Sequence, residues 1–187
     1  KKEDDVVLGF IDSISETNSN LNYLEVGSGL CRFALIVRDR FSNITIKGIE
    51  INQDLVSLGV EKGLDVVQGN VVKMDFSDQE FDLIHCSHVI EHLSYQAITN
   101  SLDELLRILK PNGYLIIRSP LHYPGFYFDL DHIRPYPPEA ILNYFRNDQQ
   151  QRVGAFRIAE ILRWYRREAV TVFNSGHVLN KTLNLIF

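Results

Sequence analysis

The sequence predicts an α/β domain with a mostly parallel sheet and helices on both of its faces. Short apolar segments rich in β-branched residues alternate along the chain with longer segments whose apolar residues recur every three or four positions. This alternation is typical of parallel sheets, because the chain must cross over one face of the sheet before it adds a strand in the same direction. The 187 residues are enough for one sizeable domain and too few for two.

The N-terminal part of the chain predicts a helix, a strand and a second helix. Residues 3–15 have apolar side chains three and four positions apart, which is the pattern of an amphipathic helix. Residues 21–26 have the pattern of a short buried strand. Between residues 30 and 41 the apolar side chains, among them Phe33 and Val37, again fall on one helical face.

The next strand, residues 44–49, is rich in β-branched residues. Asn52 can cap the helix that follows, because its side chain can accept a hydrogen bond from a free backbone N–H of the first turn. Gly63 suits the end of that helix. A third strand is expected over residues 64–68.

A fourth strand is predicted over residues 82–86, and a long helix with inward-facing leucines over residues 94–110. Pro-Asn-Gly at 111–113 is expected to end this helix, and residues 114–118 to form the fifth strand. The rest of the chain is less regular. A pair of prolines begins a predicted helix over residues 137–146.

Two later segments leave alternatives open. Residues 152–172 mix apolar and basic side chains, and their pattern does not distinguish a helix from a strand. Residues 181–187 predict a final edge strand or a short helix.

Composition excludes some classes of function. A net charge of −5 and a pI near 5.7 argue against a nucleic-acid partner, because phosphate contacts need a basic surface. The sequence has no apolar run long enough for a membrane span and no secretory signal pattern at its start. Cys31 and Cys86 are too few for a disulfide framework, so a reducing, cytoplasmic setting is expected.

The turns that follow the first two strands contain residues suited to a nucleotide-like ligand. Gly27 and Gly29 allow a tight turn and a close approach of the backbone to a ligand. Glu50 ends the second strand about 20 residues further on, where an acidic residue is the expected partner of a ribose diol. Turn geometry alone explains the glycines, and a solvated strand end explains the acid. The two features together favour a ligand site.

This pattern resembles the class I S-adenosylmethionine-dependent methyltransferases. The first motif of that family is acidic-x-Gly-x-Gly-x-Gly, which is matched by Glu25, Gly27 and Gly29, with Cys31 in place of the third glycine.

Two further motifs support the resemblance. The run from Val-Gln-Gly-Asn at 67–70 to Phe-Asp at 81–82 matches the family's segment between the third and fourth strands without a gap. Leu-Lys-Pro-Asn-Gly at 109–113 matches the family's turn before the fifth strand. The resemblance covers about residues 20–120.

The resemblance implies roles for individual residues. Glu50 would bind the ribose, Asn70 the adenine edge in place of the family's usual Asp, and the glycine turn the amino-acid end of the cofactor. Eleven residues are expected to bind the cofactor: Glu25, Val26, Gly27, Ser28, Gly29, Glu50, Ile51, Asn70, Val71, Cys86 and Ser87.

The resemblance also implies a fold and a reaction. The fold would be a three-layer, Rossmann-like sheet of seven strands in the order 3-2-1-4-5-7-6, with the last strand antiparallel. It would form one domain over residues 1–187, made up of an N-terminal helix (1–20), a cofactor-binding core (21–120) and substrate-side elements (121–187). The methyl donor would be S-adenosylmethionine, with S-adenosylhomocysteine as product. The acceptor would be an oxygen or nitrogen of a small molecule or glycan-like metabolite.

One motif permits a different interpretation. His-Val-Ile-Glu-His at 88–92 is H-x-x-E-H, the inverted zinc-hydrolase signature. On a helix, His88 and His92 would lie one turn apart and could share a metal with a third ligand. We favour the methyltransferase interpretation, in which this segment follows the fourth strand, and we expect no metal.

The acceptor side is expected after the fifth strand. Residues 119–138 form a long segment rich in aromatic residues and proline, and loops of this kind often cover active sites. His132 and His122 are the candidate general bases, because histidine titrates near neutral pH. The alternative for His132 is a purely structural contact with the core.

Two other functions stay open. A nicotinamide-dependent oxidoreductase would share the glycine turn and Glu50 but would not explain the run over residues 67–82. An S-adenosylmethionine-binding module without catalysis would keep the same cofactor residues.

Overall fold

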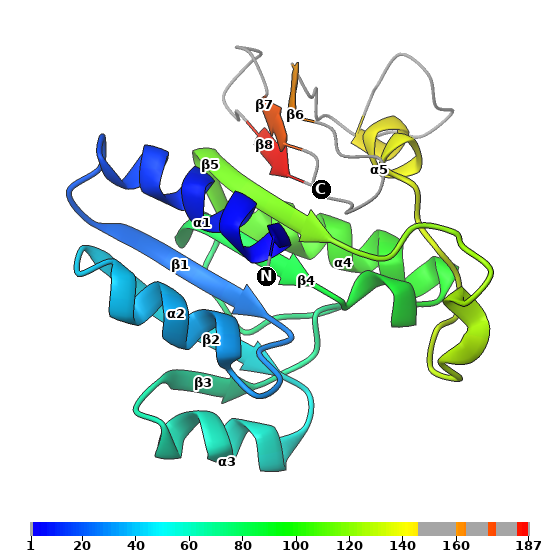
Figure 1. Ribbon diagram of the computed structural model, residues 1–187, viewed down its shortest axis with the longest axis horizontal. Coiled ribbons are helices and arrows are strands. Elements are labelled where there is room, and N and C mark those ends of the chain that lie inside the picture. The colour runs from blue at the N-terminus through cyan, green and yellow to red at the C-terminus, as the bar shows by residue number, and fades with distance from the viewer. Residues whose placement is uncertain (1, 146–159, 164–171, 175–182, 187) are drawn as a thin grey trace.

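The computed structural model describes residues 2–145, 160–163, 172–174 and 183–186 (Figure 1). These residues form an α/β structure around one eight-stranded sheet, in the order β3-β2-β1-β4-β5-β8-β7-β6. The strands are β1 (Leu21–Val26), β2 (Ile44–Glu50), β3 (Asp65–Gln68), β4 (Phe81–Ser87), β5 (Leu109–Arg118), β6 (Glu160–Arg163), β7 (Val172–Asn174) and β8 (Leu183–Ile186). The predicted fold class is confirmed.

The described residues also form five α-helices and two short 3₁₀ helices. They are α1 (Lys2–Ser15), α2 (Arg32–Arg40), α3 (Gln53–Glu61), η1 (Ile90–His92), α4 (Tyr95–Ile108), η2 (Phe126–Phe128) and α5 (Pro138–Phe145). Asn52 caps α3 as predicted, since its side chain accepts a hydrogen bond from the backbone N–H of Asp54. Among the described helices, none is long and apolar enough to cross a membrane.

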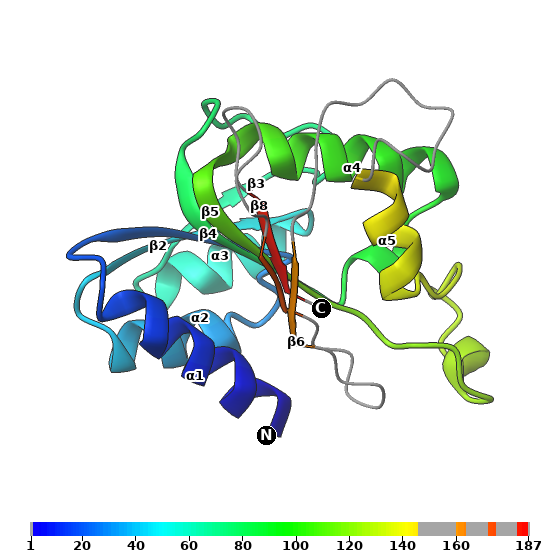
Figure 2. The same ribbon diagram turned by 90° about the horizontal axis from the view of Figure 1, so that it is seen from above.

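The helices cover both faces of the sheet, as Figure 2 shows. On one face α1 and α2 pack on a core that includes Tyr23 of β1 and Leu83 of β4. On the other face α4 and α5 pack on a second core that includes Leu24 and Ile84. Neighbouring strand residues enter opposite cores because successive side chains of a strand point to opposite faces.

The sheet reverses its order at β1. The chain runs outward from β1 to β2 and β3, then returns to place β4 on the other side of β1, and all of these pairings are parallel. In such sheets, ligands bind outside the carboxyl ends of the strands at this reversal. The topology therefore directs attention to the turns after β1, β2 and β4.

The fifth strand begins earlier than the sequence pattern predicts. Residues 109–113 belong to β5, although Pro-Asn-Gly was expected to separate helix from strand. Leu109 already pairs with Phe81 of β4, and a register irregularity in β4 follows directly. Asn112 has a positive φ of 63°. Pairing with β4 therefore outweighs the local turn preference of Pro-Asn-Gly at 111–113, and these residues become part of β5.

The C-terminal edge differs from the family order. The last strand, β8, lies beside β5 as that order predicts, but it runs parallel to β5, and the sheet has eight strands instead of seven. β6, β7 and β8 alternate in direction, so β8 runs the same way as β6, and β7 is the antiparallel neighbour. The segment 181–187 thus contains a strand, but an interior one. The rest of the ambiguous segment 152–172 lies outside the described residues, apart from β6 and the first residue of β7.

Candidate functional site

A cavity of ≈ 720 Å³ opens at the carboxyl ends of β1, β2 and β4, where the strand order reverses. Its volume is in the range of sites that bind small molecules and cofactors. Eight of the eleven residues predicted to bind a cofactor line it: Val26, Gly27, Gly29, Glu50, Ile51, Asn70, Val71 and Ser87.

The turn after β1 brings the backbone to the wall of this cavity. Gly27 and Gly29 have positive φ angles of 70° and 49°, a conformation that residues with a Cβ rarely adopt. A Cβ on Gly27 would lie only 2.4 Å from Cγ2 of Val89, a residue that also lines the cavity. Gly27 is therefore required both for the turn and for the space beside it.

Glu50 is fixed in place by three backbone amides. Its Oε2 accepts a hydrogen bond from Gly29 N–H at 2.8 Å, and its Oε1 accepts from Ile51 N–H at 2.9 Å and Asn52 N–H at 3.0 Å. A carboxylate offers about four acceptor sites, so these contacts leave one for a ligand hydroxyl. The acid thus links the two turns that form one end of the cavity.

Asn70 and Val71 begin the loop that leads from β3 to β4. The Asn70 side-chain oxygen accepts a hydrogen bond from Val72 N–H at 3.1 Å, and this contact orients the amide. One lone pair of that oxygen stays available to a ligand donor. Val71 is buried and adds apolar surface to the wall.

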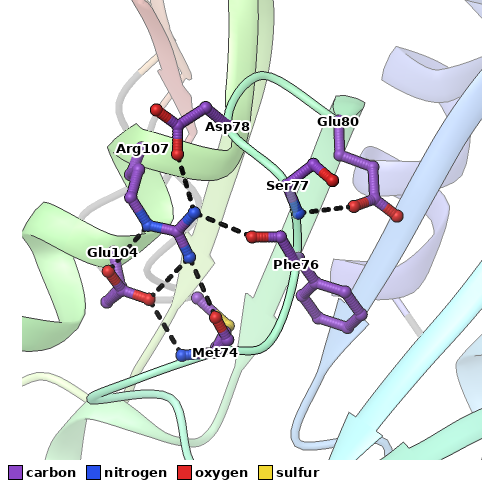
Figure 3. Close-up of polar contacts among 7 residues, drawn as sticks. All are labelled: Met74, Phe76, Ser77, Asp78, Glu80, Glu104 and Arg107. Carbon is purple, nitrogen blue, oxygen red and sulfur yellow. Dashed lines mark hydrogen bonds and ion pairs between the residues drawn. The ribbon is translucent and has the colours of Figure 1, made fainter.

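An arginine holds the same loop against α4 (Figure 3). Arg107 donates hydrogen bonds to the backbone oxygens of Met74 at 2.9 Å and Phe76 at 2.7 Å. It also forms an ion pair with Asp78 at 2.8 Å and one with Glu104, and Glu104 in turn accepts from Met74 N–H. The loop that contains Asn70 is therefore attached to a helix of the core.

The three remaining predicted residues lie beneath the cavity and do not line it. Glu25 is buried, accepts a hydrogen bond from the Tyr23 hydroxyl and lies 3.2 Å from Nδ1 of His85. Burial, together with the Glu25 charge, raises the pKa of Tyr23 well above its ordinary value. Ser28 donates to the backbone oxygen of Glu25 at 3.2 Å. In the structure, Glu25 and Ser28 support the turn from below.

Cys86 is fully buried in the core under α4. Burial raises the pKa of its thiol far above the ordinary value. It therefore acts as a small apolar residue of β4, whereas the next residue, Ser87, reaches the cavity.

Eight further residues line the cavity without having been predicted: Ile49, Gly69, Val72, His88, Val89, His92, Leu93 and Ala97. Several of them lie in the segment after β4, where the sequence signal was the H-x-x-E-H spacing. The segment follows the fourth strand, as the methyltransferase interpretation expects, and it forms one wall of the cavity.

The segment 88–92 does not form the helix that the zinc signature requires. β4 ends at Ser87, His88 follows it with a φ of 55°, and of this segment only Ile90–His92 forms a single 3₁₀ turn. Nδ1 of His88 lies 3.1 Å from Oε1 of Glu91, whose side chain is fully buried. His88 and His92 are therefore not presented on one helical face.

The loop after β5 places the two candidate bases differently. His132 is half-buried, its ring lies against Phe126 at 4.6 Å between centroids, and its Nδ1 lies 2.8 Å from the Phe126 backbone oxygen. It lines a second, shallower hollow in this loop. His122 is exposed and lines neither hollow. Their catalytic roles stay predictions.

Comparisons with known proteins agree with this geometry. A family model described as "Methyltransferase domain" matches residues 24–117. A probable methyltransferase of Arabidopsis thaliana, PMT19, is 28% identical over 120 residues, which are 62% of this chain and 19% of that protein. The phosphoethanolamine N-methyltransferase of Plasmodium falciparum is 29% identical over 111 residues, 54% of this chain and 40% of that protein.

A solved structure has the same fold over most of its length. The S-adenosylmethionine-dependent methyltransferase of Archaeoglobus fulgidus aligns with a TM-score of 0.62 and 25% identity, over 78% of this chain and 70% of that one. The chain spans between about a fifth and two fifths of the length of the curated relatives named above.

Proposed function

The chain belongs to the class I S-adenosylmethionine-dependent methyltransferases, and on that premise we propose that it transfers a methyl group to an oxygen or nitrogen atom of a small-molecule or glycan-like acceptor. The observation that most supports this proposal is the shared cavity. Residues predicted from three separate motifs line one hollow at the point where the strand order reverses.

The residues present fit the cofactor of the family. Glu50 keeps one acceptor site for a ribose hydroxyl, and the absence of a Cβ on Gly27 leaves space against Val89. Asn70 and Val71 offer a polar edge and an apolar surface for a purine at the other end. Bound there, S-adenosylmethionine would supply a methyl group on a positively charged sulfur, which leaves readily as a neutral thioether.

The contribution of the protein to the reaction is mainly positional. Methyl transfer needs the acceptor atom in line with the breaking bond, and holding two reactants in that geometry removes a large entropic cost. Glu50 and the glycine turn, fixed by backbone hydrogen bonds, orient one reactant. The aromatic loop after β5 is the candidate for orienting the other and for excluding water.

Two relatives support the proposed acceptor class. The phosphoethanolamine N-methyltransferase and an ajmaline N-methyltransferase of Rauvolfia serpentina, named for their small-molecule acceptors, are relatives over about half of this chain. They support a small acceptor of the same general kind. His132 could accept a proton from such an acceptor, and His122 is the second candidate.

The test is a calorimetric titration with S-adenosylhomocysteine, with NAD and NADH titrated in parallel. We expect micromolar binding of S-adenosylhomocysteine alone. Glu50→Ala should weaken it at least about tenfold (~1.4 kcal/mol). Glu61→Ala, an exposed acid at the end of α3, is the matched control and should bind as the wild type does.

The contrary results are equally specific. The proposal would be contradicted if the folded protein did not bind S-adenosylhomocysteine, or if it bound NAD more tightly. Equal affinity in Glu50→Ala would remove Glu50 from the site. Acceptors would then be screened by release of S-adenosylhomocysteine with amines, phenols and sugars.

A further inference from the structure

Three side chains with metal-binding atoms meet beside the cofactor cavity. Glu91 and His92 belong to η1, and His132 belongs to the loop after β5. One ligand atom from each lies within 4.8 Å of the others. His92 also lines the cavity itself. The group combines two parts of the chain that are distant in the sequence.

Backbone contacts hold the two parts together. The carbonyl oxygen of Glu91 accepts hydrogen bonds from Ile133 N–H at 2.9 Å and Arg134 N–H at 3.4 Å. The rings of His92 and His132 lie with centroids 5.0 Å apart. The backbone of Ile133 and Arg134, next to His132, is therefore bonded to η1, and this contact fixes where His132 lies relative to Glu91 and His92.

Both histidines are held in a tautomer that leaves Nε2 free to bind a metal. Nδ1 of His92 lies 3.0 Å from the Asp131 backbone oxygen, and Nδ1 of His132 lies 2.8 Å from the Phe126 backbone oxygen. A carbonyl oxygen only accepts, so each Nδ1 must be protonated, and each Nε2 has a free lone pair in the neutral ring. Metal-ligating histidines commonly have this arrangement, with the second nitrogen bound to a carbonyl.

The carboxylate of Glu91 has an unexplained oxygen. The side chain is fully buried, and Oε1 lies 3.1 Å from His88 Nδ1, but Oε2 has no hydrogen-bond partner among the described residues. A buried carboxylate oxygen without a partner is costly, and a cation is one group that compensates it. Besides Glu91, the carboxylate of Asp129 lies near His132. Its Oδ2 is 3.7 Å from Nε2 of His132, which is too far for a hydrogen bond.

We propose that Glu91, His92 and His132 bind a divalent transition-metal ion of the zinc type. Two imidazoles and one carboxylate are a ligand set found in catalytic zinc sites, which keep a further position for water or substrate. That position would lie next to the cavity wall that His92 forms, where an oxygen atom of an acceptor could occupy it. With a metal on Nε2, His132 would be a ligand and could not act as a general base, so His122 would be the candidate base. A metal at this place would also contradict the absence of metal that the sequence predicts.

The experiment measures metal binding directly and needs neither cofactor nor activity. Zn²⁺ is titrated into chelator-treated full chain in competition with a chromogenic chelator, and Co²⁺ is added separately to record its visible absorption. We expect one ion per chain with micromolar or tighter affinity. His132→Ala and Glu91→Gln should each weaken binding at least tenfold, and His122→Ala, from the same loop, should not.

Binding of S-adenosylhomocysteine to each variant, together with circular dichroism, shows whether it is folded. If a variant does not fold, ¹³C-labelled histidine in the wild type provides the answer: Zn²⁺ should shift the signals of His92 and His132 and not that of His122. No zinc retained by the wild type, or unchanged affinity in a folded His132→Ala, would overturn the proposal. Neither result would affect the cofactor proposal, which the titration with S-adenosylhomocysteine tests separately.

Discussion

Arg107 and Glu104, one turn apart on α4, face each other with N–O contacts of 2.8 and 2.9 Å, and together they bind both backbone polar groups of Met74 (Figure 3). This pair is more than a surface ion pair, because it satisfies main-chain groups of the loop that leads from Asn70 to β4. By holding this loop in place, the pair also supports Asn70, which lies at the predicted adenine end of the cavity.

Replacing Arg107 with Met should destabilise the protein. The change removes charge-assisted hydrogen bonds to two backbone oxygens and leaves Glu104 without its cation, so we expect a loss of about 2 kcal/mol in the free energy of unfolding. Urea unfolding measures it. Arg40→Met is the control, since exposed Arg40 forms a weak ion pair with Asp12 at 3.5 Å and lies over the Phe41 ring, and among the described residues it binds no loop backbone. Its loss should cost about 0.5 kcal/mol or less. Equal effects in both variants would show that the Arg107 contacts add no stability.

The same pair makes stability depend on pH. Hydrogen bonds from Arg107, the largest cause, lower the pKa of Glu104 below its ordinary value of 4.5, although burial opposes them. A carboxyl with a lower pKa in the folded state contributes stability that is present above its ordinary pKa and is lost as the pH falls through the folded pKa. Acidification from about pH 6 to about pH 3 should therefore cost wild type more than Glu104→Gln. Parallel curves of unfolding free energy against pH would contradict this.

Gly27→Ala should weaken cofactor binding for two separable reasons. The new Cβ meets Val89 at 2.4 Å, and a φ of 70° is unfavourable for alanine. We expect at least about tenfold weaker binding of S-adenosylhomocysteine (~1.4 kcal/mol). Adding Val89→Ala should restore the steric part only.

The matched control for that series is Gly9→Ala in α1, where a Cβ meets nothing within 4 Å. It should leave affinity unchanged and raise stability slightly, because alanine favours helix more than glycine does. Full recovery in the double variant would mean that backbone strain at Gly27 has no effect on binding.

Neither cysteine should react with thiol reagents in the folded protein. Cys31 and Cys86 are both free and buried, and burial raises the pKa of each thiol, so little reactive thiolate forms. Both should be labelled slowly by an aromatic disulfide reagent in native buffer and at once in denaturant. Ser13→Cys, at an exposed position of α1, provides the fast reference. Rapid labelling of either native cysteine would contradict the described packing.

The sequence alone identified half of the residues that line the cavity. Gly27, Glu50 and Asn70 each lie at a strand end, and parallel strands bring their carboxyl ends to one edge of the sheet, so three short motifs were enough to locate a common site. Strand alternation could also have excluded Glu25. The Glu25 side chain points to the opposite face of the sheet from Val26, and there it contacts Tyr23 and His85.

Contacts between distant segments were decided only by the tertiary structure. Spacing in the sequence pairs His88 with His92, whereas in the fold β4 ends just before His88 and His132 lies beside His92 instead. The Arg107 contacts and the extension of β5 through 109–113 have the same origin. Periodicity and turn residues report interactions within a few positions, and so they determine elements and strand ends. Which side chains meet across loops depends on how those elements pack, because packing energy outweighs local preference.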